Sequence, residues 1–243
     1  MTPPVRFPHR FRGHCPICEC ARNFTIWNDQ YRDTFLCDGC IKHSIPRERA
    51  IAVVLKRMFP GWRGLAIHES SPVNRGISAQ LLRQCPGYLA TQYYPDHPPG
   101  AVVKGFRNEN LEGQTFEDES FDIVLTQDVM EHVNDFPKVL LDIHRTLRPG
   151  GAHIFTTPTY LSAKTVQWAW YRDGEIEWIY EPEYHGNPVD AEGSAVTFHY
   201  GYDFPDLIEE HCGLATEVVR MHDFTQGIAG PMTEVYVIRK APV

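Results

Sequence analysis

Short apolar segments alternate with amphipathic ones along most of the chain, a pattern typical of α/β proteins. Apolar residues recur at helical spacing over residues 47–59, 74–85, 136–147 and 203–211. Short apolar runs predict strands within residues 62–72, 88–94, 101–105, 121–126, 152–157, 215–221 and 233–239. Strands and helices that alternate in this way predict a doubly wound, mostly parallel sheet with helices on both faces.

Residues 159–200 interrupt this alternation with an aromatic-rich insertion. Its large aromatic residues are Trp168, Trp170, Tyr171, Trp178, Tyr180, Tyr184 and Tyr200. The segment is too apolar for a disordered linker. Two interpretations stay open: a substrate-covering lid whose rings stack on an acceptor, or ordinary core packing.

Two Cys-x-x-Cys pairs near the N-terminus predict a metal site formed by Cys15, Cys18, Cys37 and Cys40. Residues 24–27 and 34–36, between the pairs, are predicted to form a hairpin, and a structural Zn²⁺ would replace the core that so short a segment cannot build. The sequence therefore predicts a zinc-ribbon-like module over residues 1–45. Cys20, His14 and His43 are alternative donors, and free buried cysteines are the other interpretation.

Charge is distributed unevenly between the two ends of the chain. Residues 1–63 contain 11 Lys and Arg against 5 Asp and Glu, whereas the remainder contains 12 against 26, for a net charge of −8 overall. The acidic remainder favours a small-molecule or peptide acceptor over nucleic acid. No apolar run is long enough to cross a membrane, and no apolar stretch follows the basic N-terminus, so a cytoplasmic location is expected.

Three consecutive motifs carry a family resemblance: residues 116–124 (FEDESFDIV), 128–133 (DVMEHV) and 147–151 (LRPGG). Over about residues 64–158 the chain resembles the class I S-adenosylmethionine (AdoMet)-dependent methyltransferases, and among them those of type 11. The resemblance implies a Rossmann-like methyltransferase domain over residues 46–243, with AdoMet at the carboxyl ends of the strands. Residues 183–188 (EYHGNP) also look like a segment of bacterial methyltransferases from glycan or secondary-metabolite pathways.

The resemblance assigns cofactor-binding positions to the ends of four strands. The turn after the first strand lacks the glycines usual in the family, and its polar groups are expected to bind the amino-acid tail of AdoMet. The second and third strand ends are expected to face the ribose and the adenine, and the fourth strand end to lie beside the reacting methyl group. In chain order these residues are His68, Glu69, Ser70, Ser71, Gln92, Tyr93, Asn108, Glu109, Asn110, Gln127 and Asp128.

Methyl transfer from a sulfonium depends mainly on alignment, and a hydroxyl acceptor would also benefit from a nearby base. The candidates are His185 and His199 in the insertion, with His132 as a further candidate that is also compatible with simple packing. The function predicted is methyl transfer to an O or N atom of a sugar, secondary metabolite or peptide-derived acceptor. The alternatives are a catalytically inactive methyltransferase-like binding protein, and a macromolecule methyltransferase that uses the zinc module for recognition.

Overall fold

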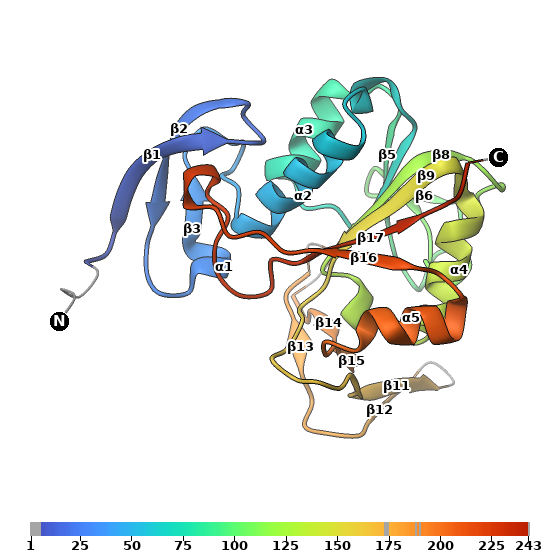
Figure 1. Ribbon diagram of the computed structural model, residues 1–243. Coiled ribbons are helices and arrows are strands. Elements are labelled where there is room, and N and C mark those ends of the chain that lie inside the picture. The colour runs from blue at the N-terminus through green and yellow to red at the C-terminus, as the bar shows by residue number, and fades with distance from the viewer. Residues whose placement is uncertain (1–5, 173–174, 188, 190, 243) are drawn as a thin grey trace. The chain divides into compact units, whose positions relative to one another are not determined.

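The chain divides into two compact units in the computed structural model, which describes residues 6–172, 175–187, 189 and 191–242 (Figure 1). Unit 1 contains the described residues up to Gly64, together with Val73–Pro86 and Val219–Val235. Unit 2 contains Leu65–Pro72, Gly87–Val218 and the described residues from Tyr236 onward. Unit 1 thus extends past the predicted 1–45 module, and the boundary after residue 45 stays a prediction.

Unit 1 combines a small antiparallel sheet with three α-helices and two short 3-10 helices among its described residues. The strands are β1 (His9–Cys15), β2 (Cys20–Ile26) and β3 (Phe35–Cys37), and the helical segments are α1 (Tyr31–Thr34), α2 (Pro46–Met58), η1 (Trp62–Gly64), α3 (Gly76–Gln84) and η3 (Phe224–Gln226). The predicted hairpin is confirmed as β2 and β3, and β1 is an additional strand that pairs with β2. Helix α2 begins at a proline, and Glu48 accepts a hydrogen bond from the Ile45 amide at 3.1 Å.

The buried side chain of Arg49 connects the parts of unit 1. Its guanidinium donates hydrogen bonds to the carbonyls of Phe35 and Gly227, at 2.7 and 2.8 Å, and to both oxygens of Ser44. The same group lies 5.1 and 5.0 Å from the ring centroids of Phe24 and Phe35. A buried cation is stable here because hydrogen bonds and aromatic faces replace its water.

Unit 2 is built around an eight-stranded sheet, counted over the residues that the model describes. The strands run in the order β16-β17-β9-β8-β4-β5-β7-β6. Their bounds are β4 (Ile67–Ser70), β5 (Tyr88–Gln92), β6 (Val102–Val103), β7 (Phe106–Asn108), β8 (Phe121–Gln127), β9 (Leu147–Thr156), β16 (Thr216–Val219) and β17 (Val235–Arg239). The β4–β5, β4–β8, β5–β7 and β8–β9 pairs are parallel. Strand β6 pairs antiparallel with β7, and β17 pairs antiparallel with β9. The prediction of a mostly parallel, Rossmann-like sheet is confirmed.

The predicted third strand needs correction. Residues 101–105 supply only the edge strand β6, while the parallel strand beside β5 is Phe106–Asn108. The apolar residues Val102 and Val103 attracted the prediction, yet Val102 is largely exposed. The polar strand β7 is stable because it pairs with β5 at Thr91–Arg107 and Gln92–Asn108.

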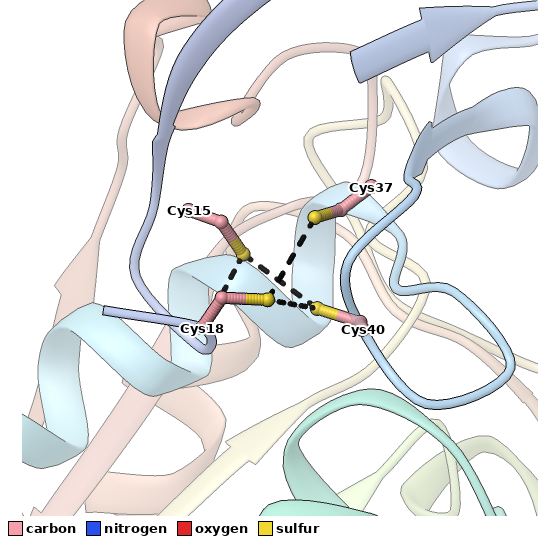
Figure 2. A group of neighbouring side chains, drawn as sticks. All are labelled: Cys15, Cys18, Cys37 and Cys40. Carbon is pink, nitrogen blue, oxygen red and sulfur yellow. Dashed lines mark hydrogen bonds between the residues drawn. The ribbon is translucent and has the colours of Figure 1, made fainter. Parts of the chain in front are cut away.

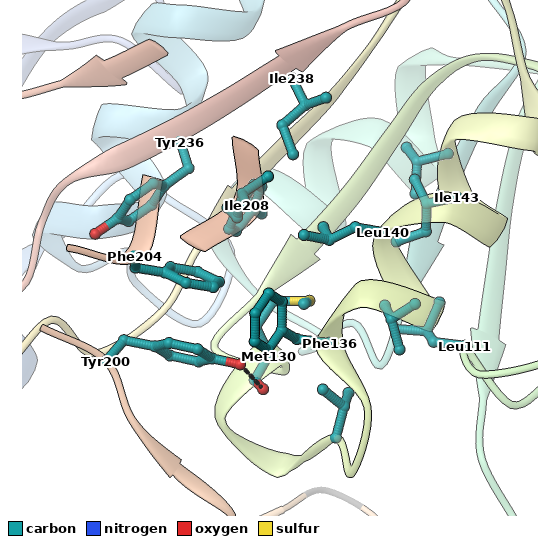
Figure 3. Close-up of a cluster of buried hydrophobic side chains, with 14 of the residues drawn as sticks. Leu111, Met130, Phe136, Leu140, Ile143, Tyr200, Phe204, Ile208, Tyr236 and Ile238 are labelled. Carbon is teal, nitrogen blue, oxygen red and sulfur yellow. Dashed lines mark hydrogen bonds between the residues drawn. The ribbon is translucent and has the colours of Figure 1, made fainter. Parts of the chain in front are cut away.

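The helices of unit 2 are η2 (Met130–His132), α4 (Phe136–Thr146) and α5 (Phe204–Cys212), and the last two confirm the predicted helices. Buried hydrophobic side chains from α4, α5 and the sheet form one cluster (Figure 3). Tyr200 stacks on Phe204 with ring centroids 3.8 Å apart, and its hydroxyl donates to the Met130 carbonyl at 2.9 Å. Tyr200, at the end of the insertion, is therefore a core residue.

The rest of the insertion forms three small antiparallel sheets within its described residues. They contain β10 (Val166–Gln167) with β15 (Phe198–His199), β11 (Ala169–Arg172) with β12 (Glu175–Trp178), and β13 (Tyr184–His185) with β14 (Ser194–Ala195). Trp170 and Tyr184 are 37% and 51% exposed, unlike Tyr200. Core packing is therefore the role of Tyr200, whereas a substrate-covering role for the exposed rings stays a prediction. Residues 173–174, 188 and 190 lie outside the described residues.

Two histidines are buried in the sheet, on the two strands that flank β8. His68 pairs in register with Val124, which pairs with His153 on the next strand. Their Nε2 atoms lie 2.9 and 3.0 Å from the hydroxyls of Thr91 and Thr126. Burial lowers the pKa of each imidazole to about 3, so both are neutral at physiological pH.

Because these histidines are buried, the free energy of unfolding should decrease at acidic pH. Between pH 6.5 and about 3 the unfolded chain binds protons at these histidines and the folded chain does not, so stability falls as the pH falls, by about 1.4 kcal/mol per pH unit for each. Denaturant unfolding at pH 7 and pH 5 should show a smaller pH dependence for His68→Gln than for the wild type. The exposed His222→Gln is the matched control; equal slopes for all three proteins would contradict this assignment.

Candidate active site

The order of the parallel strands locates the candidate site. From β4 the chain proceeds outward to β5 and β7, and then returns to the other side of β4 as β8 and β9. The carboxyl ends of β4 and β8 therefore flank the point at which the direction of winding reverses. Doubly wound sheets bind ligands outside the strands at this point. The predicted residues His68–Ser71, Gln127 and Asp128 lie at these two strand ends.

The turn after β4 has the backbone conformation of a glycine-containing turn. Ser71 has a φ of +55°, a left-handed value that glycine adopts without strain, and its amide donates to the Thr91 carbonyl at 2.8 Å. Ser70 is buried at the end of the strand. Ser71 thus has a backbone conformation that glycine adopts more readily than serine.

Glu69 is fully buried beside this turn and is bound from both sides. Its two carboxylate oxygens accept hydrogen bonds from the Tyr88 hydroxyl at 2.7 Å and from Gln127 Nε2 at 2.6 Å. These contacts hold the carboxylate between β5 and β8. Glu69 is therefore held in a fixed position at the level of the site.

His68 and the end of β5 differ in their surroundings. The ring of His68 packs at 5.1 Å from both Phe116 and Phe121, inside the sheet layer. Gln92 is buried and its carbonyl accepts from the Glu109 amide at 3.0 Å, whereas Tyr93 is 49% exposed. The surroundings of His68 are those of a packing residue. The predicted roles of His68, Gln92 and Tyr93 in cofactor binding stay predictions.

The side chains of Asn108 and Glu109 are occupied by neighbouring loops. Asn108 accepts from the Tyr94 amide at 2.8 Å and donates to three carbonyls of the 94–98 segment. The Glu109 carboxylate accepts from Arg107 Nε at 2.7 Å and from Thr115. These side chains order the loops after β5 and β7. Asn110, which follows them, accepts from the Glu112 amide at 2.9 Å.

The end of β8 turns at a second left-handed residue. Asp128 has a φ of +51°, its amide donates to the Thr156 carbonyl at 2.9 Å, and its carboxylate accepts from the Thr156 hydroxyl at 2.9 Å. Strained non-glycine residues persist where surrounding contacts over-determine them, often at functional sites. Both strand ends at the switch point, Ser71 and Asp128, have this property.

The three predicted histidines converge with two glutamates just beyond this turn. We call Glu131, His132, Glu183, His185 and His199 the histidine–glutamate cluster. Glu183 lies 3.1 Å from His185 Nε2 and 2.8 Å from His199 Nε2, one carboxylate oxygen to each. Glu131 Oε1 lies 3.7 Å from His132 Nε2 and 3.8 Å from His185 Nδ1.

The two glutamates were absent from the predicted site. Each lies next to a predicted histidine in the sequence, as Glu131-His132 and Glu183-Tyr-His185, and this adjacency was the available signal. Glu131 and Glu183 both raise the pKa of His185, with the Glu131 contact as the larger cause. Contact with His199 and His185 in turn lowers the pKa of Glu183 against the opposing effect of burial.

Aromatic stacking fixes the ring of His199. Its centroid lies 4.1 Å from that of Tyr160 and 3.8 Å from that of Trp168, with nearly parallel planes, and Trp168 stacks on Tyr180 in turn. The Trp168 indole donates to the Glu181 carbonyl at 2.9 Å. The rings of the insertion therefore hold part of the cluster, and stacking on an acceptor stays a prediction for the more exposed rings.

The four predicted cysteine ligands meet in unit 1 (Figure 2). Their sulfur atoms all lie within 4.8 Å of one another, with pairs at 3.3, 3.6 and 4.0 Å. Four thiolates around one Zn²⁺ at about 2.3 Å lie about 3.8 Å apart, so the spacing fits. Hydrogen bonding with Cys18 lowers the pKa of Cys15, and hydrogen bonding with Cys15 raises the pKa of Cys37 and Cys40.

Comparison with known proteins identifies a methyltransferase-like segment in the chain. Residues 85–155 match the family model described as a methyltransferase domain, and they contain the strand ends of β5, β7 and β8. The matched segment contains all three of the sequence motifs, which confirms their resemblance to methyltransferases. No curated protein matches the chain.

Solved structures share the fold at low sequence identity. An S-adenosylmethionine-dependent methyltransferase from Mesorhizobium loti is 19% identical, with 79% of this chain and 98% of that chain covered and a TM-score of 0.50. A 1,6-didemethyltoxoflavin-N1-methyltransferase from Burkholderia thailandensis, solved with its substrate and S-adenosylhomocysteine, is 16% identical, with 80% and 78% covered and a TM-score of 0.48. Over the described residues, none of the helices has the length and apolarity needed to cross a membrane.

Proposed function

We propose that the turn after β4 binds the amino-acid tail of AdoMet. Two observations support this: Ser71 has a left-handed conformation that glycine favours, in the turn where the family resemblance implies glycines, and the turn lies at the switch point of the sheet. Ser70 and Ser71 offer hydroxyls and amides to the carboxylate of the tail, while Glu69 contributes negative charge near its ammonium group. Gln127 and Asp128 flank the methyl position from β8.

Substitutions at Ser71 test this placement. A β-branched residue is strongly disfavoured at a φ of +55°, so Ser71→Val should weaken S-adenosylhomocysteine binding at least about tenfold by calorimetry. Ser71→Gly is the matched control and should retain the wild-type affinity. Equal affinity of the valine and glycine variants would remove the turn from the binding site.

We further propose that the acceptor atom is a hydroxyl oxygen of a small molecule, such as a sugar or phenolic metabolite. The observation that carries this proposal is the convergence of the three histidines with Glu131 and Glu183 beyond the end of β8. A hydroxyl must lose a proton during methylation, and imidazoles held by carboxylates can accept one. A neutral amine can attack with its lone pair before it loses a proton, so its methylation depends less on a base beside the acceptor atom.

The position of each residue in the cluster determines its proposed role in the reaction. AdoMet, when bound, supplies a methyl group whose bond to sulfur breaks as the bond to the acceptor oxygen forms. His185, which is partly exposed, contacts both glutamates and is placed to take the hydroxyl proton. His199 is fixed by stacking and by Glu183, so it positions that carboxylate. The insertion around them limits the access of water.

Product analysis with AdoMet and a panel of sugars, phenols and amines tests the acceptor class. We expect methyl ethers as products, and we expect His185→Asn to lower turnover about 100-fold or more without changing the affinity for S-adenosylhomocysteine. The exposed His211→Asn is the control and should retain turnover. Methylation of amines alone, or normal turnover by His185→Asn, would contradict the proposal.

For unit 1 we propose a structural Zn²⁺ held by Cys15, Cys18, Cys37 and Cys40. Four thiolates complete a tetrahedral shell and leave no open position for a substrate, which is typical of a structural site. Elemental analysis should show about one zinc per chain in the wild type and loss of zinc in Cys40→Ser. Cys20→Ser, the alternative donor, should retain zinc; the reverse pattern would reassign the fourth ligand.

A further inference from the structure

The inner part of the histidine–glutamate cluster contains a buried carboxylate oxygen that lacks a hydrogen bond. Glu131 is 1% exposed, and its Oε2 accepts from the Thr157 hydroxyl at 3.1 Å. Its Oε1 has no hydrogen-bond partner among the described residues, although His132 Nε2 and His185 Nδ1 lie 3.7 and 3.8 Å away. A buried charged oxygen without a partner is costly, so a missing group is indicated.

Hydrogen bonds orient both imidazoles so that one nitrogen of each faces this oxygen. His132 Nδ1 lies 2.9 Å from the Ala195 carbonyl, which can only accept, so Nδ1 carries the proton and Nε2 presents a lone pair. His185 Nε2 lies 3.1 Å from the Glu183 carboxylate, which in the same way leaves Nδ1 on the inner side. Metal-bound histidines typically donate their outer N–H to a carbonyl or a carboxylate in this manner.

The backbone also holds the three residues together. Glu131 and His132 belong to η2, directly after β8, and the Glu131 carbonyl accepts from the amide and the hydroxyl of Thr197, at 2.7 and 2.9 Å. The strand pair β13–β14 contains His185 and Ala195. The donor atoms of Glu131, His132 and His185 consequently lie within 4.8 Å of one another.

We propose that Glu131 Oε1, His132 Nε2 and His185 Nδ1 bind a divalent metal ion. Two imidazoles and one carboxylate are borderline-to-hard ligands that suit Mn²⁺, Fe²⁺, Co²⁺ or Zn²⁺, and three protein ligands leave positions open for water or substrate. The positive ion would compensate the negative charge of the buried Glu131 carboxylate. Glu183 and the Ala195 carbonyl form the outer layer that orients the ligands.

The role of the ion rests on the proposed methyl transfer to a hydroxyl. A divalent ion that binds the acceptor oxygen lowers the pKa of that hydroxyl and fixes its position. His185 would then bind the ion rather than take the proton directly, and the released proton would pass to solvent or to a neighbouring carboxylate. Loss of either imidazole would remove this activation.

Metal titration tests the site without the use of activity. In zinc-loaded full-length protein, we expect one further saturable site per chain for Mn²⁺, followed by its electron paramagnetic resonance signal, or for Co²⁺, followed by its absorption. Glu131→Gln and His185→Asn should each weaken this binding at least about tenfold. Glu183→Gln, in the outer layer, should weaken it about 10-fold to 100-fold. His211→Asn should bind as the wild type does.

Two results would overturn the metal proposal. The first is the absence of saturable binding of both ions beyond the cysteine site, and the second is unchanged binding by Glu131→Gln in protein that retains its zinc. Either result leaves the hydroxyl-methylation proposal intact, with His185 as the proton acceptor. If the second metal binds but no methyl ether forms, the metal site stands and the proposed acceptor class fails.

Discussion

The parallel pairing of β4 with β8 is the contact on which the candidate site depends. It sets Ser70 beside Thr126, so the two strands end at the same edge, and each continues into a residue with a left-handed backbone. The chain turns at Ser71 and at Asp128, and the segments beyond deliver the polar groups of the site. A shift of one residue in this pairing would exchange the faces on which His68 and Glu69 lie and would bury the carboxylate where the histidine now packs.

The local pattern of apolar residues was sufficient to predict the helices and strands that bury an apolar segment or face. Strand β8 and helices α2 and α4 follow from their own residues, because each buries an apolar segment or face. The third parallel strand did not, since Arg107 and Asn108 are polar and owe their place to β5 and to the 94–98 loop. Contacts between residues distant in sequence stabilise such a strand, and a short window of sequence does not contain them.

The candidate site was predictable residue by residue but not as an arrangement. His132, His185 and His199 were each selected for their chemistry, and only the folded insertion shows that they share two carboxylates. The same limit applies in the opposite direction to Asn108, a polar residue at a strand end whose side chain binds its own loop. A residue's type limits what it can bind, while its neighbours in space determine what it does bind.

The described residues contain two donor clusters of different chemistry, and the members of each lie within one compact unit. The four thiols of unit 1 are soft ligands that would fill a tetrahedral shell around the proposed zinc, whereas the imidazoles and carboxylate of unit 2 are harder and would leave positions open on the proposed ion. A closed shell stabilises a fold, and an open one can contact a reacting atom. Because neither cluster draws a ligand from the other unit, stability in unit 1 and chemistry in unit 2 can be altered by separate substitutions.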